Sequence, residues 1–343
     1  MLRAVRTPTL LARVRRTLRE RALIERGQRV LVACSGGPDS AALLVVLAQL
    51  SRSLDITLEA ASVDHGLRAD ASADVALAAA QAAALGVPFH ALTVKVRRAP
   101  SLQAAARGAR YAALLTLARK LGAARVAVGH TRDDQAETVL LRLLRGASVL
   151  GLSGIAPRRQ DGVIRPLIDC DRAAVAAFAA AHHVSLARDP SNADERFARV
   201  RLRTRVMPAL LAENPNLVAQ LCDLADDGRA LLDALRPRAE ALLAASAQDT
   251  EIMDISSWGA EPEPVRRLAL RAWLRPLLGR DLLRAHIAQL DRALLGHGEV
   301  WLPSGFAVVA RGDGLLRLVH GRAVHRQRGV RAPAPVRSRR KKA

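Results

Sequence analysis

Aromatic residues are scarce in this chain of 343 residues, where three Trp, one Tyr and four Phe make up 2% of the sequence. Half of the residues are nonetheless hydrophobic. The cores must therefore be built mostly from Ala, Leu and Val, and the chain is long enough for two or three of them.

Cysteine is almost absent as well. Cys34, Cys170 and Cys222 lie far apart and form no C-x-x-C pair. This spacing excludes a disulfide framework and a structural zinc site, and it predicts a reduced, cytoplasmic protein. No apolar run reaches the roughly 18 residues of a membrane span, so we expect no membrane partner. We expect the Arg-rich segment before Gly27 to be an amphipathic helix that docks on the first domain.

Acidic residues are too few to balance the basic ones: 32 Asp and Glu face 53 Lys and Arg, which gives a net charge of +21 and a pI near 11.5. Such a charge indicates a polyanionic partner, usually nucleic acid. Biased genome composition can also produce a chain rich in Arg and Ala. Because a charge this large costs self-repulsion, we favour nucleic acid.

A glycine turn separates an apolar run over 29–34 from an Ala/Leu segment over 41–47, which predicts strand, turn and helix. The turn is Ser35-Gly36-Gly37-Pro38-Asp39-Ser40. Its two glycines leave backbone N–H groups bare, and the serine hydroxyls and the helix dipole add to an anion site suited to a nucleotide phosphate. The Walker spacing is absent. The alternative is an ordinary Gly-rich turn.

Asp39 stands where a Walker motif would carry lysine. A carboxylate beside a phosphate cradle is favourable only with a cation between them, so Asp39 predicts a Mg²⁺-bound triphosphate or pyrophosphate.

Strands alternate with helices through the first half of the chain. We expect strands at 28–34, 56–63, 89–96 and 125–128, helices at 39–50, 71–85 and 102–121, a short edge strand at 165–168, and a helix after Asp171 that ends near Ala181. This order predicts an α/β fold with a doubly wound parallel sheet, whose ligands bind at the carboxyl ends of the strands.

The second half is predicted to be mainly helical. Helices are expected at 217–245, 265–277 and 281–295, followed by a small antiparallel element at 299–302 and 306–319. The predicted domains are an N-terminal helix (1–27), a nucleotide-binding catalytic domain (28–213), a mainly helical domain (214–320) and a basic disordered tail (321–343). The tail is either a nucleic-acid arm or a solubilising end.

Polar residues follow two of the predicted strands. Asp64 and His65 end the second, where an Asp often meets the adenosine of a nucleotide, although Asp-His-Gly is also a common turn. After the fourth strand come His130, Asp133, Asp134 and Glu137. Capping of a helix N-terminus explains two of these acids but not His130, so we favour a functional cluster that faces the glycine turn.

Arginines recur at every second position from Arg199 to Arg205. They cannot all share one helix face, so some must line a cleft or pair with carboxylates.

Three segments closely resemble the PP-loop (N-type) ATP pyrophosphatases, whose fold is adenine nucleotide alpha hydrolase-like. They are Ser35 to Ser40, Val63-Asp64-His65-Gly66-Leu67-Arg68, and Gly129-His130-Thr131-Arg132-Asp133-Asp134-Gln135-Ala136-Glu137-Thr138. Within this superfamily the tRNA(Ile)-lysidine synthases match best. Further matching segments extend the likeness over residues 8–210: Arg107 to Tyr111, Arg165-Pro166-Leu167, Asp189-Pro190-Ser191-Asn192 and Phe197 to Arg201.

The resemblance implies a ligase that uses ATP to adenylate the wobble cytidine of an isoleucine tRNA with a CAU anticodon, after which free L-lysine displaces AMP. It implies that Ser35, Gly36, Gly37, Pro38 and Ser40 bind pyrophosphate, that Asp39 binds Mg²⁺, and that Asp64 and His65 bind the nucleotide. His130, Asp133, Asp134 and Glu137 would orient the base, bind a second Mg²⁺ or hold the lysine ammonium. Arg199, Arg201 and Arg203 would hold tRNA phosphates. The sequence leaves a homodimer open.

The chain departs from the family pattern at Val200, where Asn is usual, and at Arg188, where Glu is usual. The part after Gln220 is short compared with long-form members of the family, so the resemblance implies one mainly helical tRNA-binding domain at 214–320. The alternatives are a PP-loop tRNA 2-thiolation enzyme, which would need cysteine pairs, and a non-catalytic RNA-binding protein, which would not need the intact glycines, serines and carboxylates.

Overall fold

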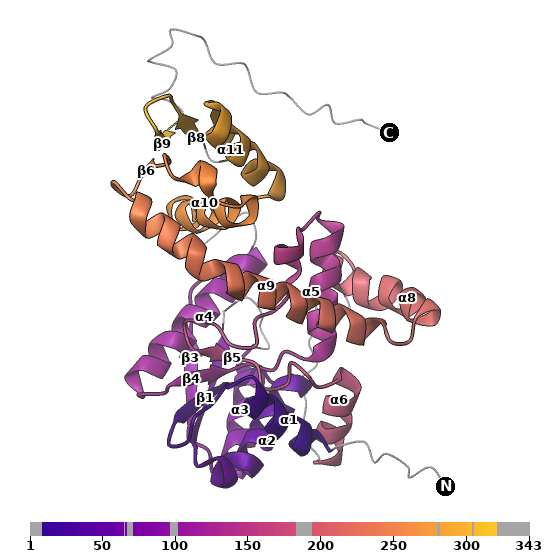
Figure 1. Cartoon of the computed structure of the whole chain (residues 1–343). Coiled ribbons are helices and arrows are strands. Elements are labelled where there is room, and N and C mark those ends of the chain that lie inside the picture. The colour runs from indigo at the N-terminus through magenta and orange to yellow at the C-terminus, as the bar shows by residue number, and fades with distance from the viewer. Residues whose placement is uncertain are drawn as a thin grey trace, which may run out of the picture. The chain divides into compact units, whose positions relative to one another are not determined.

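The structure, a computed structural model shown in Figure 1, describes residues 9–64, 66, 71–96, 102–182, 194–279, 282–303 and 305–320. Two compact units divide the chain: residues 1–145 with 151–229, and residues 146–150 with 230–343. The division falls inside one long helix, after Arg229. His65, the segment 189–192 and the basic tail 321–343 lie outside the described residues. No described helix is long and apolar enough to cross a bilayer.

The first unit is built on a parallel sheet of five strands in the order β3-β2-β1-β4-β5. The strands are β1 (Arg29–Ala33), β2 (Thr57–Asp64), β3 (Phe89–Thr93), β4 (Arg125–Ala127) and β5 (Val163–Ile164). The order reverses between β1 and β4, which pair directly from Val30 and Arg125 onward. This reversal confirms the predicted doubly wound sheet and places its ligand crevice at the carboxyl ends of β1 and β4.

Side chains alternate across the sheet, as strand geometry requires. Val30 and Val32 pack into the core on one face, together with α1 (Leu10–Glu20), α2 (Pro38–Leu54), α3 (Ala71–Ala84) and α6 (Arg172–Ala181). Leu31 faces the other core, which α4 (Leu102–Lys120) covers. The remaining helices of this unit are α5 (Arg132–Leu144), α7 (Ala198–Arg201) and α8 (Met207–Glu213), and α9 (Leu217–Ser246) begins in it.

The edge strand was predicted at the wrong position, 165–168. The strand is Val163–Ile164, and Arg165 already begins a turn in which the Ile168 amide donates to the Arg165 carbonyl at 3.2 Å. Pro166 has no N–H to donate, so it cannot continue the ladder that pairs β5 with β4.

The N-terminal helix docks on the first unit by its apolar face, as predicted: Leu10, Val14 and Leu18 lie in the core, and polar contacts add to this packing. Thr17 donates to Asp169 at 2.9 Å, and the guanidinium of Arg21 bridges Asp169 and Asp226 at 2.7 and 2.8 Å. These contacts tie α1 to the segment before α6 and to α9.

The second unit holds α10 (Glu263–Leu278), α11 (Arg284–Gly296) and an antiparallel sheet in the order β6-β9-β8-β7. Its strands are β6 (Ile252–Asp254), β7 (Glu299–Leu302), β8 (Phe306–Ala310) and β9 (Leu315–His320). The predicted helical pair and antiparallel element are confirmed, whereas the three residues of β6 were not foreseen. Trp258 fills the core, and its indole donates to the Ser246 hydroxyl at 2.7 Å.

Gly129 lets the chain after β4 pass against the first turn of α2. A Cβ at this position would lie 2.9 Å from the carbonyl carbon of Asp39 and 3.1 Å from the Ser40 amide nitrogen. Backbone atoms cannot move aside as a side chain can. Only glycine therefore allows the two strand ends of the crevice to approach this closely.

We expect Gly129→Ala to lower the free energy of unfolding by about 1–3 kcal/mol, because overpacking displaces the first turn of α2. Gly108→Ala is the matched control, since a Cβ there meets nothing within 4 Å and alanine favours a helix. Urea unfolding of both variants measures the effect. Equal stability for Gly129→Ala and the parent chain would contradict this role.

Candidate active site

The glycine turn after β1 is shaped by its own serines. Gly36 has a φ of +76°, which glycine adopts without strain. The Ser40 hydroxyl donates to the Gly37 carbonyl at 3.0 Å and accepts from the Ser35 amide at 3.0 Å. Ser40 therefore holds the loop in shape, while Ser35 is exposed and its hydroxyl lies 3.1 Å from that of Ser40. Helix α2 starts with Pro38 and has no side-chain cap, so its N-terminus is open to an anion.

Asp39 carries an unused oxygen at this N-terminus. Its Oδ1 atom is buried and has no hydrogen-bond partner among the described residues. Burial, with the nearby charges of Asp134 and Asp133, raises the pKa of Asp39 to about 6, although Arg172 and Arg203 oppose the shift. A buried carboxylate oxygen without a donor suits a hard cation such as Mg²⁺. Among the described residues no group of three or more His, Cys, Asp or Glu side chains is arranged to hold a metal.

Helix α5 begins at a capping box. The Thr131 hydroxyl accepts from the Asp134 amide at 3.4 Å, and the Asp134 carboxylate accepts from the Thr131 amide at 2.8 Å. The predicted alternative, an acid that caps this helix, is therefore correct for Asp134. Asp133 instead caps the neighbouring helix, because it accepts from the Arg172 amide at the start of α6 at 2.7 Å.

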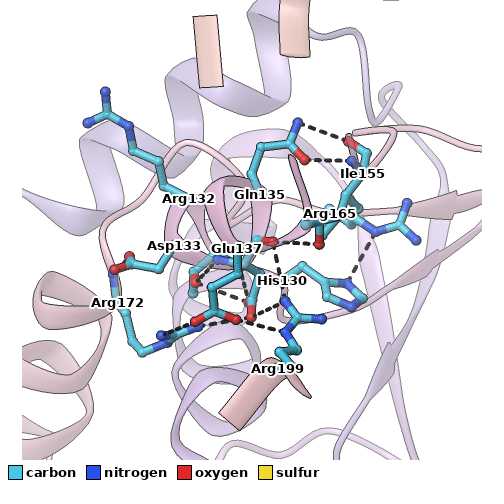
Figure 2. Close-up of polar contacts among 12 residues, drawn as sticks. His130, Arg132, Asp133, Gln135, Glu137, Ile155, Arg165, Arg172 and Arg199 are labelled. Carbon is cyan, nitrogen blue, oxygen red and sulfur yellow. Dashed lines mark hydrogen bonds and ion pairs between the residues drawn. The ribbon is translucent and has the colours of Figure 1, made fainter. Parts of the chain in front are cut away.

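Two arginines neutralise the carboxylates of this helix (Figure 2). Arg172 contacts Asp134 and Glu137 at 2.9 Å each. Arg199 contacts Glu137 at 2.7 Å and Asp134 at 3.0 Å. Burial by itself would raise the pKa of Asp134, but the two guanidinium groups outweigh it and hold this pKa below its ordinary value. The Glu137 side chain is only 3% exposed, and a carboxylate buried to this degree needs counter-charges beside it, which Arg172 and Arg199 supply.

His130 lies between β4 and α5, and its Nδ1 atom accepts from the Nε of Arg165 at 3.2 Å (Figure 2). Of the predicted cluster, the structure brings His130, Asp134 and Glu137 together through Arg172, Arg199 and the charge of Asp134 on His130. Asp39 lies near enough for the charge of Asp134 to act on its pKa.

The remaining predicted site residues that the structure describes make other contacts. Asp64 ends β2, and its carboxylate accepts from the Gly66 amide at 2.7 Å. Arg201 is exposed and donates to the carbonyls of Glu195 and Arg196 at 2.7 and 2.8 Å. Arg203 is close enough to lower the pKa of Asp39.

Sequence reasoning missed Arg172 as a site residue. A signal was present, since a positive charge in the first turn of a helix opposes the helix dipole and needs a compensating partner. Arg165 was noted only as part of a motif. Its contact with His130 depends on the turn that begins at Arg165, where the sequence predicted a strand.

The PP-loop domain model matches residues 8–210, which defines the first unit as a PP-loop domain. The chain is 39% identical to a tRNA(Ile)-lysidine synthase of Methylobacterium sp. (strain 4-46), over 92% of this chain and 91% of the relative. It is 38% identical to that of Salinispora tropica, over 91% of this chain and 98% of the relative. The chain belongs to the tRNA(Ile)-lysidine synthase family. Membership makes it an enzyme and implies the use of ATP.

A solved structure shares the fold at much lower identity. The U34-tRNA thiolase NcsA from Methanococcus maripaludis, with its 4Fe-4S cluster, aligns with a TM-score of 0.54 and 18% identity over 65% of this chain and 78% of that chain. This likeness concerns the fold alone. Cys34 and Cys170 are buried in the present structure, and Cys222 is partly so.

In buffer without divalent cations, we expect Asp39→Asn to stabilise the protein at about pH 8 by roughly 1–3 kcal/mol. A carboxyl whose folded pKa, about 6, exceeds its unfolded value of 3.8 adds stability below the unfolded pKa. This stability is lost as the pH rises through the folded pKa, and Asn does not suffer the loss. The advantage of the variant should vanish near pH 4.

Denaturant unfolding of both proteins across this pH range is the measurement. The exposed Asp223→Asn is the matched control and should differ little from the parent chain. Identical stability curves for Asp39→Asn and the parent chain would contradict the burial of an unpaired carboxylate.

Proposed function

We propose that this chain is a carbon–nitrogen ligase that forms lysidine at the wobble cytidine of an isoleucine tRNA with a CAU anticodon. The observation that carries the proposal is the unpartnered, buried oxygen of Asp39 at the open N-terminus of α2, facing the cluster at the start of α5, in a chain of this family. Its substrates are ATP, tRNA and free L-lysine, which meet in the cytoplasm, where we expect it to act.

The reaction takes two displacements. The C2 oxygen of cytidine attacks the α-phosphorus of ATP, a phosphorus–oxygen bond forms, and the bond to the β-phosphate breaks with release of pyrophosphate. The ε-amine of lysine then attacks C2, AMP leaves with the oxygen, and the amine loses a proton. Adenylation is needed because an amide-like oxygen is a poor leaving group.

The loop at 35–40 would bind the departing pyrophosphate. Its backbone N–H groups and the exposed Ser35 hydroxyl can donate hydrogen bonds to an anion. The N-terminus of α2 adds the positive end of the helix dipole. Asp39 would hold Mg²⁺, which when bound neutralises the phosphate charge. Positioning and charge neutralisation then supply most of the rate.

The side chains at the start of α5, with the arginines that pair with them, would orient the base and the lysine. Asp134 and Glu137 are matched in charge by Arg172 and Arg199, so the cluster is near neutral before substrates arrive. Arg199 would have to leave Glu137 to contact a tRNA phosphate, whereas Arg201 is already exposed. We propose that residues 214–320 also contact the tRNA, but their 12 Arg do not outnumber their 14 Asp and Glu. The basic excess that attracts a polyanion lies in residues 1–213 and 321–343.

Incubation of the protein with ATP, lysine and the unmodified tRNA should release AMP only when lysine is present. Asp39→Asn should lower this rate by about 100-fold or more while tRNA binding is retained. The reason is that the variant lacks the carboxylate that would hold Mg²⁺ against the charge of the pyrophosphate. Asp223→Asn is again the control. If folded protein releases no AMP with the right tRNA, the proposal is wrong, and an unchanged rate for Asp39→Asn would remove Asp39 from the mechanism.

A further inference from the structure

Arg165 is a buried cation without a carboxylate. Its exposure is 3%, and no acidic side chain among the described residues pairs with it. Its guanidinium donates from Nε to the Nδ1 of His130 at 3.2 Å and from another nitrogen to the Ala156 carbonyl. Arginine is rarely buried unless it is paired, so this contact to a neutral ring needs an explanation.

The contact decides which nitrogen of His130 carries the proton. Arginine has only donors and stays charged in proteins, so the nitrogen facing it must be an acceptor. Nδ1 is therefore unprotonated, and the proton of the neutral ring is on Nε2. Within the described part of the chain Nε2 has no hydrogen-bond acceptor, which leaves its N–H for a ligand.

The surroundings oppose a second proton on this ring. Burial lowers the pKa of His130 most, and Arg165, Arg107 on α4 and Arg199 on α7 lower it further. Asp134 on α5 raises this pKa, but that carboxylate is already shared by Arg172 and Arg199.

Other cations gather around Tyr111, a side chain that also interacts with Arg165. The buried Tyr111 ring has the guanidinium groups of Arg107, Arg110 and Arg159 at 5.2, 5.7 and 5.0 Å from its centroid. Cations stacked on this ring reinforce the positive field beside the imidazole.

We propose that Arg165 is a positioning residue that keeps His130 neutral with its proton on Nε2, so that His130 donates a hydrogen bond to a substrate oxygen and does not act as the general base. The identity of that oxygen, on the nucleotide or on the adenylated cytidine, rests on the proposed function. The tautomer of His130 does not depend on the proposed function, because it follows from the contact with Arg165. The proton lost by the lysine amine must then pass to another acceptor.

The direct test is long-range ¹H–¹⁵N NMR of protein labelled at its nine histidines, followed from about pH 5 to about pH 9. Comparison with the spectrum of His130→Gln assigns the His130 signals. We expect the pattern of an Nε2–H tautomer that does not titrate over this range. A proton on Nδ1, or an ordinary titration between pH 6 and 7, would overturn the proposal.

Arg165→Met removes the donor and the charge. The His130 ring should then populate both tautomers and titrate at a higher pH than in the parent chain. Arg159→Met is the matched control, because it also removes a cation beside Tyr111 but breaks no contact with His130. If Arg165→Met retains the parent spectrum, Arg165 is not the positioning residue. If that variant does not fold, the parent spectrum and the charge-preserving Arg165→Lys decide between the outcomes.

Activity provides a second readout. The side-chain amide of Gln places an N–H donor where Nε2–H lies, so His130→Gln should retain at least about tenfold more lysine-dependent AMP release than His130→Ala. A general base would leave both variants equally poor, and that result would overturn the donor role. If the spectra are as expected but no variant or parent releases AMP, the proposed function fails while the Arg165–His130 pair stands.

Discussion

The buried carboxylate of Glu137 is the constraint on which the rest of the site depends. A charge with 3% exposure is unstable unless counter-charges meet it, and the protein supplies Arg172 from α6 and Arg199 from α7. These two helices follow β5, far along the chain from α5. The need to neutralise one side chain therefore fixes three segments around the carboxyl end of β4.

On the side of the crevice formed by the glycine turn and α2, polar groups are left unpaired. Around Asp39 the chain leaves a carboxylate oxygen unpaired and a helix N-terminus uncapped, and the absence of a side chain at Gly129 brings both against the segment after β4. Charges are thus paired on one side of the crevice, while the other side keeps the unpaired groups that we propose bind a nucleotide and its cation. His130 joins the two sides as a neutral donor.

The sequence predicted what depends on local pattern: the parallel sheet, the glycine turn, the helix after β4 and the acids at its start. It did not predict which cation meets which acid, because those partners lie more than 30 positions apart. The alternating arginines indicated that some would pair with carboxylates, but only the structure shows that Arg199 is one of them, paired with Glu137 and Asp134. Arg165 was placed in a strand, although Pro166 ends the ladder there. Spacing within a segment is local physics, whereas ion pairing is decided by the fold.

The most direct measurement uses ATP labelled in its α-phosphate and an unmodified tRNA with a CAU anticodon, in the absence of lysine. The account predicts that the label moves to the wobble cytidine of the tRNA with release of pyrophosphate, and that added lysine discharges it as AMP. Binding of ATP and tRNA by folded protein with no transfer of label to the RNA would contradict the account.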